Sequence, residues 1–188
     1  MAPSPGRPDA PTIAELDALP GPACVAALAP LFEGAPRFLA RLCAARPFGD
    51  APTLFARARS IAQAMPEPEQ VELIDAHPRI GAPAASVSAL SFLEQGYGRE
   101  AAEAAAEAAA VELAERGRVA GELDRLNAAY EGRFGFRYCV FVAGRTRADL
   151  LPDFEVALAA ERASEIARAL DAVVDIAADR WRTLGDVD

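Results

Sequence analysis

The chain has 188 residues, of which 52% are hydrophobic and 25% charged, with a formal net charge of −9 at pH 7. This composition fits one globular domain, and we expect it over residues 12–188, after a disordered tail over residues 1–11. The acidic balance argues against nucleic-acid and anionic-membrane partners, because both require a continuous basic face. No apolar run is long enough to span a bilayer and no secretory signal is evident, so we expect a cytoplasmic protein.

The basic residues are all arginines, and the chain contains one histidine, His77. Schiff-base and pyridoxal phosphate enzymes are excluded, because both need a lysine. Cys24, Cys43 and Cys139 lie far apart without a CxxC pair, so we expect buried, reduced thiols and neither a disulfide framework nor a zinc site. We therefore expect no metal and no organic cofactor, with an all-carboxylate magnesium site left open.

The first third of the chain has helical periodicity. Thr12 and Glu15 match a capping box, which predicts a short helix around Leu16. Apolar residues at spacings of three and four continue to residue 65 and are interrupted by prolines. We expect several short antiparallel helices here, separated at Pro30, Pro36, Pro47 and Pro52.

His77 is predicted to lie at the end of a helix. Pro66 restarts the chain, and the apolar pattern that follows must stop near Ala76, because Pro78 disfavours a helical conformation at the residue before it. A loop of small residues follows.

The middle of the chain predicts two further helices. Ser91 and Glu94 match a second capping box, and residues 100–115 are mostly alanine and glutamate, which predicts a solvated helix. The helical pattern continues over residues 119–130, with one apolar face formed by Leu123, Leu126 and Tyr130.

One segment conflicts with an all-helical fold. Every second residue from Phe134 to Val142 is aromatic or valine, which taken alone predicts a strand. Helical signals then return: Thr146 begins a helix that Pro152 kinks or breaks, and residues 157–184 predict a long C-terminal helix.

Three short motifs contain residue types suited to catalysis. They are His77-Pro78-Arg79-Ile80-Gly81, then Ser91-Phe92-Leu93-Glu94-Gln95, then Asn127, Tyr130 and Arg133-Phe134-Gly135-Phe136. Each has a structural interpretation as well: a histidine favourable at a helix C-terminus, a helix cap, and a surface arginine stacked on a ring. The three together, in this order, are more specific than any one of them.

These motifs resemble those of the 2-oxo-4-hydroxy-4-carboxy-5-ureidoimidazoline (OHCU) decarboxylase family of urate degradation, from about Leu31 to the C-terminus. The resemblance implies a single all-α domain of about eight helices, in which the aromatic segment is an extended connection bordering the site. It also implies decarboxylation of a small ureide to (S)-allantoin without a cofactor, and a homodimer as a possible assembly.

The resemblance further implies which residues form the site. His77 corresponds to the catalytic acid/base, Glu94 to a group that orients it or the ureide, and Arg133 to a cation that fixes an anionic or carbonyl oxygen. Substrate contacts are implied for Pro78, Ser91, Gln95, Phe136, Tyr138, Cys139 and Val140.

Two alternatives stay open at this point. The chain could be a non-catalytic helical domain that binds a ligand or a protein, or a decarboxylase or hydrolase of a related ureido or imidazole acid. It also departs from the family pattern, with extra residues between Glu94 and Tyr130, and with Ala157, Leu158 and Ala160 where many members have Arg-Leu-x-Asn. Neither departure removes a proposed catalytic group.

Overall fold

The computed structural model describes residues 11–96 and 110–185, and all regular secondary structure in these ranges is helical. The predicted all-α fold is confirmed, whereas the predicted tail and most of the predicted solvated helix lie outside the described residues. No helix within the described ranges is long and apolar enough to cross a membrane. The helices are α1 (Ile13–Ala18), α2 (Gly21–Leu28), α3 (Pro36–Ala44), α4 (Ala51–Ala64), α5 (Glu67–Asp75), the 3₁₀ turn η1 (Ala84–Ser86), α6 (Ala89–Glu94), α8 (Ala110–Phe134), α9 (Arg147–Leu158) and α10 (Arg162–Gly185).

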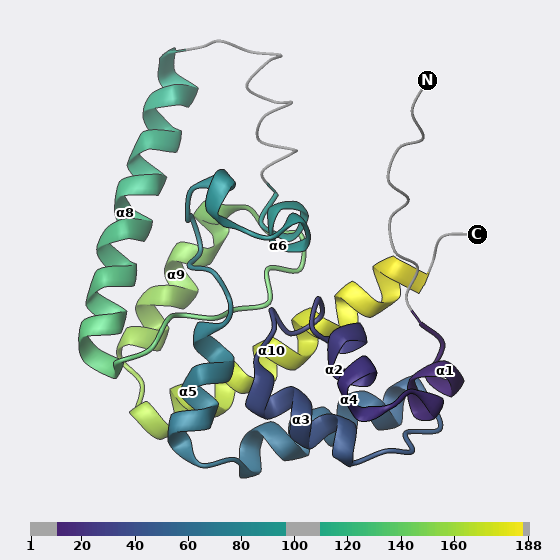
Figure 1. Cartoon of the computed structure of the whole chain (residues 1–188). Helices are drawn as coiled ribbons and strands as arrows, with labels where there is room; N and C mark the ends of the chain where they lie inside the picture. The colour runs from purple at the N-terminus through teal and green to yellow at the C-terminus, as the bar shows by residue number, and fades with distance from the viewer. Residues whose placement is uncertain (1–10, 97–109, 186–188) are drawn as a thin grey trace, which may run out of the picture.

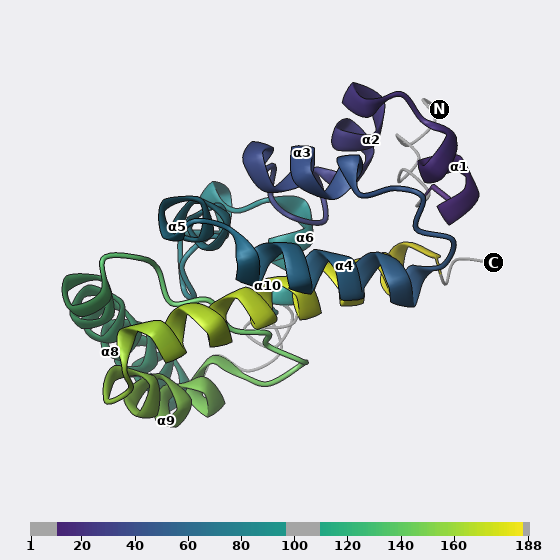
Figure 2. The ribbon, with the colours of Figure 1, turned by 90° about the horizontal axis from the view of Figure 1, so that it is seen from below.

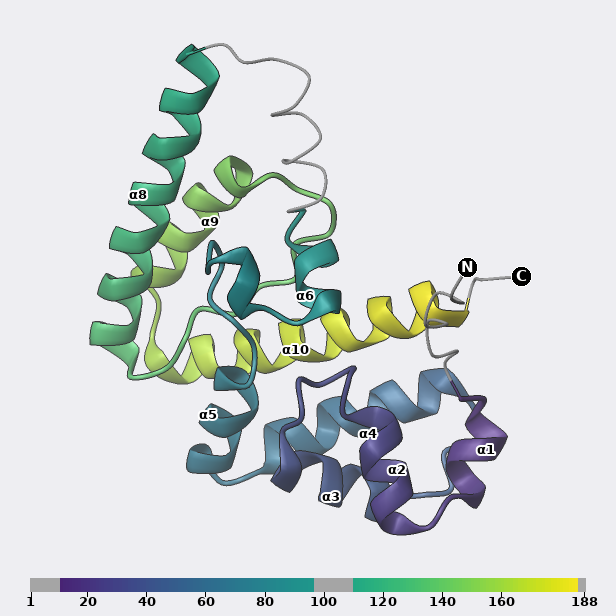
Figure 3. The same cartoon turned by 45° about the horizontal axis from the view of Figure 1, so that its top comes forward.

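The C-terminal helix α10 is the central element of the fold. It lies between α6, α8 and α9 on one side and the five N-terminal helices on the other (Figure 3). Helices α4 and α5 pack directly against it, and α4 runs alongside it when the molecule is seen from below (Figure 2). Helices α8 and α9 pair with each other, as do α2 and α3 (Figure 1). Side chains of α10 therefore reach both halves of the molecule.

Local signals fixed the starts of several helices. The capping boxes of Thr12 and Thr146 are both formed, each with the acidic side chain three residues later. Pro36 and Pro52 occupy the first turns of α3 and α4, where the missing N–H costs nothing. These two prolines therefore begin helices, which explains the series of short N-terminal helices.

Two helix boundaries differ from the prediction. Ser91 lies inside α6, and its backbone N–H donates to the hydroxyl of Ser88, at 3.1 Å, so the predicted cap at Ser91 is wrong. The predicted helix over residues 157–184 is divided at residues 159–161, and Pro152 lies within α9 without ending it. The hydroxyl of Ser91 does not cap the helix and instead contacts Glu33 and Arg180.

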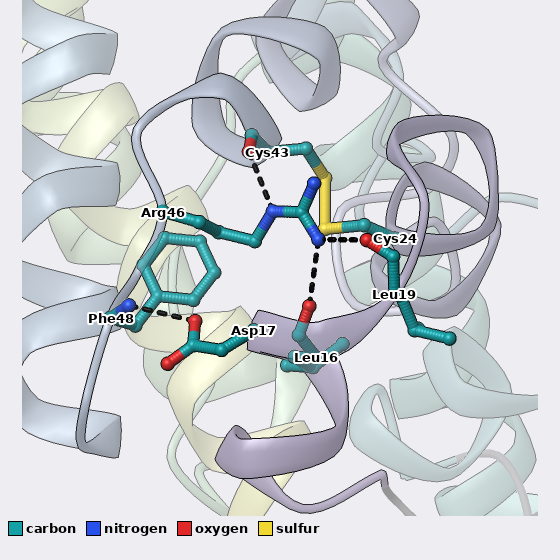
Figure 4. The surroundings of a disulfide bond; sticks show 7 residues. All are labelled: Leu16, Asp17, Leu19, Cys24, Cys43, Arg46 and Phe48. Atoms are coloured by element: carbon teal, nitrogen blue, oxygen red, sulfur yellow. Dashed lines mark hydrogen bonds between the residues drawn. A yellow bond between two sulfur atoms is a disulfide. The ribbon is translucent and has the colours of Figure 1, made fainter.

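Cys24 and Cys43 form a disulfide with a Cα–Cα distance of 6.1 Å, so the expectation of reduced thiols is wrong for this pair. The bond joins α2 to α3, whose facing surfaces bring together cysteines that are 19 residues apart (Figure 4). Only Cys139, among the described residues, is a free buried thiol. Disulfides are rare in a reducing cytosol, and the expected cytoplasmic location stays a prediction.

Arg46 lies beside the disulfide and ties α1 to the end of α3. Its guanidinium donates to the carbonyl oxygens of Leu16, at 2.9 Å, Cys43, at 2.8 Å, and Leu19 (Figure 4). The N-terminal helices are therefore joined to one another by one covalent bond and by one half-buried cation.

The segment between α8 and α9 is an extended connection, and within the described residues it pairs with no strand. Its aromatic side chains pack into a ring cluster: Phe136 is 5.6 Å from Tyr130, and Tyr138 stacks on Phe154 at 3.8 Å. Burial of these rings accounts for the alternating pattern, so the extended connection is confirmed and the strand interpretation is wrong.

Candidate functional site

His77 lies just beyond the last turn of α5, as predicted. Its backbone N–H donates to the carbonyl of Ile74, and its ring Nδ1 is 3.4 Å from the carbonyl oxygen of Leu73. Arg137, on the extended connection, donates to the carbonyl oxygens of Asp75 and His77 and so satisfies this helix end. Nδ1 is thus directed to the helix, whereas the buried Nε2 has no hydrogen-bond partner among the described residues.

The loop after His77 is held by α6 and α8. Gly81 has a φ of +83°, and a Cβ added there would lie 3.2 Å from Cδ1 of Leu123, so this position requires glycine. Its N–H donates to Oε1 of Gln95, at 3.2 Å, and Asn127 donates to the carbonyl oxygen of Ile80, at 3.1 Å. The two later motifs therefore fix the backbone of the first.

Arg180, on α10, is the cation of the site. Its side chain is only 4% exposed, and Nη2 donates to Oε1 of Glu33, at 2.8 Å, Oε2 of Glu94, at 2.9 Å, and Oγ of Ser91, at 3.0 Å. Nη1 donates to two carbonyl oxygens in the loop between α2 and α3. Its Nε has no partner among the described residues and remains available to a ligand.

The two carboxylates on Arg180 differ in their surroundings. Burial raises the pKa of Glu33, but hydrogen bonds from Ser91 and Ser88 and the charge of Arg180 outweigh it, so this pKa lies below its usual value. Burial also raises the pKa of Glu94, and Arg180 opposes it only in part, so that pKa lies above its usual value. Glu94 is the carboxyl that protonates more readily, and its buried Oε1 has no partner among the described residues.

His77, Glu94 and Arg180 border one small cavity of about 20 Å³. Eight of the ten predicted site residues line it: His77, Pro78, Ser91, Glu94, Gln95, Tyr138, Cys139 and Val140. The remaining lining residues are Ile80, Val142, Ile176 and Arg180. The cavity thus combines an apolar wall with one imidazole, one cation and a carboxyl group.

The imidazole of His77 is neutral at physiological pH. Burial, followed by the positive charge of Arg180, lowers its pKa from 6.5 to about 4, although the negative charge of Glu33 acts in the opposite direction. A neutral ring whose Nδ1 faces a carbonyl oxygen leaves the lone pair of Nε2 to accept a proton. Nε2 of His77 is therefore free to accept a hydrogen bond or a proton from a ligand.

Arg133 and Phe136 are the two predicted site residues that do not line the cavity. The side chain of Arg133 is exposed, donates to the carbonyl oxygen of Ala160, at 3.1 Å, and lies over the ring of Phe134, at 5.1 Å. This is the stacked surface arginine of the structural interpretation. Phe136 is buried in the ring cluster, with Arg162 over its face.

Arg180 and Glu33 are the site residues that sequence reasoning missed. Arg180 continues the apolar stripe of α10, at a spacing of three and four from Ala177 and Ile176, and a charge on a buried stripe signals a buried ion pair. Glu33 lies in a loop, where periodicity carries no such signal.

Within residues 11–96 and 110–185, no group of three or more His, Cys, Asp or Glu side chains is placed to hold a metal ion. The acidic, imidazole and thiol groups of the cavity come from separate elements, and the carboxylate of Glu94 binds Arg180.

A family model described as OHCU decarboxylase matches residues 17–182. The chain belongs to the OHCU decarboxylase family. This membership implies that the chain is a decarboxylase, and therefore a lyase, of urate catabolism. Among curated protein sequences, none is significantly similar to this member of the family.

Two solved structures share the fold of this family member. One is an OHCU decarboxylase crystallised in the presence of (S)-allantoin, with a TM-score of 0.58 and 21% identity, covering 82% of this chain and 94% of that chain. The other is an (S)-allantoin synthase, with a TM-score of 0.60 and 18% identity over 93% of this chain. This chain spans only 54% of that second protein.

Proposed function

We propose that this protein converts 2-oxo-4-hydroxy-4-carboxy-5-ureidoimidazoline (OHCU) to (S)-allantoin and carbon dioxide without a cofactor. The observation that carries the proposal is a single cavity lined by His77, Glu94 and Arg180, in which Nε2 of His77 and Oε1 of Glu94 are buried without partners among the described residues. Buried polar atoms are normally paired, so such atoms indicate groups kept for a ligand.

The substrate supplies its own electron sink. The bond between C4 and the carboxylate breaks, and its electron pair forms a C4=C5 double bond while the adjacent imine nitrogen takes a proton. The resulting enol then gains a proton on one face of C5 and loses its hydroxyl proton, which gives the carbonyl of allantoin. One proton is consumed overall.

The three polar groups have complementary roles in this reaction. Neutral His77 accepts a hydrogen bond from the 4-hydroxyl and takes its proton as the enol becomes the carbonyl, because its lowered pKa leaves Nε2 unprotonated. Burial raises the pKa of Glu94, which makes it, of the two carboxyl groups on Arg180, the better suited to deliver a proton to the substrate. Arg180 binds an anionic or carbonyl oxygen of the ureide, because a protein of net charge −9 must provide a local cation.

The cavity must enlarge for the substrate to bind. A volume of about 20 Å³ holds a single water molecule, whereas the ureide has a ring, a carboxylate and a ureido chain. Val140 and Val142 lie on the extended connection, which is not held by helical hydrogen bonds. We expect this connection to move away from α6 on binding.

The proposal is tested by the chirality of the product. OHCU that has been freshly made by an enzyme decays spontaneously to racemic allantoin, so formation of the S enantiomer above this background, followed by circular dichroism, demonstrates catalysis. We expect His77→Asn to abolish the S excess while the protein remains folded. A racemic product with the wild-type protein, or full activity of His77→Asn, would overturn the proposal.

Two further measurements separate the alternatives. Calorimetric binding of the ureide without turnover would indicate a binding domain, and turnover of a different ureido acid in a substrate panel would indicate a related decarboxylase or hydrolase.

A further inference from the structure

The two carboxylates that share Arg180 are bound to very different extents. Oε1 of Glu33 accepts hydrogen bonds from Ser91, at 2.5 Å, Ser88, at 2.8 Å, and Arg180, at 2.8 Å. Glu94 accepts one, from Arg180, through Oε2. Glu33 is therefore held from two other parts of the chain, whereas Glu94 is held by Arg180 alone among the contacts of the described residues.

The backbone conformation around Glu33 places its carboxylate against Arg180. Glu33 has a φ of +52°, a left-handed conformation that is unusual for a residue with a side chain and that persists only when the surroundings impose it. The same loop offers the carbonyl oxygens of Pro30 and Leu31 to Nη1 of Arg180. This one loop therefore contacts both terminal nitrogens of the guanidinium, Nη1 and Nη2.

We propose that Glu33 is a positioning residue: it is the permanent counter-ion that fixes the orientation of Arg180, so that Glu94 can exchange its bond with Arg180 for the substrate. This inference rests on the proposed function, because it presumes that Arg180 binds the reacting ureide. Glu33 is a positioning residue and not a catalytic one, since it is absent from the cavity lining.

The charge of Glu33 also acts on the proton-transfer groups. The charged groups that face Glu94 are Arg180, Glu33 and Asp179, and those that face His77 are Arg180 and Glu33. The negative charge of Glu33 raises the pKa of both. Removing this charge alone should lower both pKa values and move the pH profile of turnover toward acid.

The first test compares Glu33→Gln with Glu122→Gln, a matched change in an ion pair with Arg125 on the surface of α8. We expect Glu33→Gln to lower kcat at pH 7 by about tenfold or more, the range for a lost charged hydrogen bond, and to shift both limbs of the kcat profile to lower pH. Glu33→Asp should recover part of kcat, and Glu122→Gln should match the wild type. A Glu33→Gln enzyme with an unchanged pH profile and kcat would overturn the inference.

The second test does not depend on turnover. Thermal unfolding is measured for Glu33→Gln, Arg180→Met and the double variant. Glu33→Gln should lower Tm in the wild-type background but raise it in Arg180→Met, because without Arg180 the buried Glu33 and Glu94 carboxylates repel each other. If Arg180→Met does not fold but the double variant does, this outcome supports the inference in the same way.

An equal loss of Tm in both backgrounds would overturn the pairing of Glu33 with Arg180. Absence of OHCU turnover by the wild type would instead overturn the proposed function and leave the unfolding measurement to decide on Glu33. The two failures are therefore distinguishable.

Discussion

The burial of the imidazole of His77 keeps the ring neutral and also makes the fold sensitive to acid. The unfolded chain binds a proton at His77 near pH 6.5, but the folded chain does so only near pH 4. Between these values the unfolded state holds more protons, so the free energy of unfolding falls as the pH is lowered through this window.

Replacing His77 should remove this part of the acid sensitivity. We expect the wild type to lose about 3 kcal/mol between pH 7 and pH 4 from this group, and His77→Asn to lose correspondingly less. Urea unfolding of both proteins at several pH values measures the difference, which isolates His77 because the carboxylates are common to both and the chain has no other histidine. Parallel stability curves would contradict the buried, neutral imidazole.

A second residue-scale prediction concerns which arginine serves the reaction. Arg180→Gln should reduce kcat by about 10²- to 10³-fold, the usual loss for a buried donor to a developing charge. Arg133→Gln should leave kcat within about twofold, because that side chain is exposed and its contacts in the described part of the chain are a carbonyl and a ring. A large loss in Arg133→Gln with an active Arg180→Gln would restore the expectation made from the sequence.

Sequence motifs identified the site residues that lie within the three motifs or just after them, and missed Glu33 and Arg180, which lie outside them. His77 and Pro78, like Glu94 and Gln95, are neighbours within motifs, so recognising one located the other. Arg180 meets Glu33 across 147 residues and Glu94 across 86, and only the packing of α10 against both halves brings them together.

At the scale of elements, helix starts were predictable at the two complete capping boxes, at Thr12 and Thr146, whereas the cap of α6 was assigned to Ser91 instead of Ser88. The break at residues 159–161 was not, because no proline or glycine occurs there. The disulfide was missed for a related reason: the spacing of Cys24 and Cys43 does not show that α2 and α3 face each other.

The disulfide should contribute measurably to the stability of the N-terminal helices. It closes a loop of about 20 residues, a length at which a cross-link typically contributes about 3 kcal/mol. We expect dithiothreitol to lower Tm of the wild type and to have little effect on Cys24→Ala/Cys43→Ala, measured by calorimetry. Since this loop contains Glu33, reduction should also lower kcat. Equal Tm values with and without reductant would show that the bond contributes nothing.

At the scale of the whole molecule, the site is assembled from elements that are far apart in the chain. His77 follows α5, Glu94 ends α6, Arg180 is on α10, Glu33 is in the loop between α2 and α3, and Tyr138 is on the extended connection. The halves that these elements form lie on opposite sides of α10 (Figure 3). No contiguous part of the chain contains a complete site.

Activity and global structure should therefore be lost together. In a urea titration, we expect kcat and the helical circular dichroism signal to decline with the same midpoint and slope, because the packing of α10 holds both the core and the charge cluster. A control with Glu122→Gln, which alters only a surface pair, should leave both midpoints in place. Loss of activity at a clearly lower urea concentration than loss of helix would mean that one element, with the loop bearing Glu33 as the first candidate, detaches from α10 before the fold is lost.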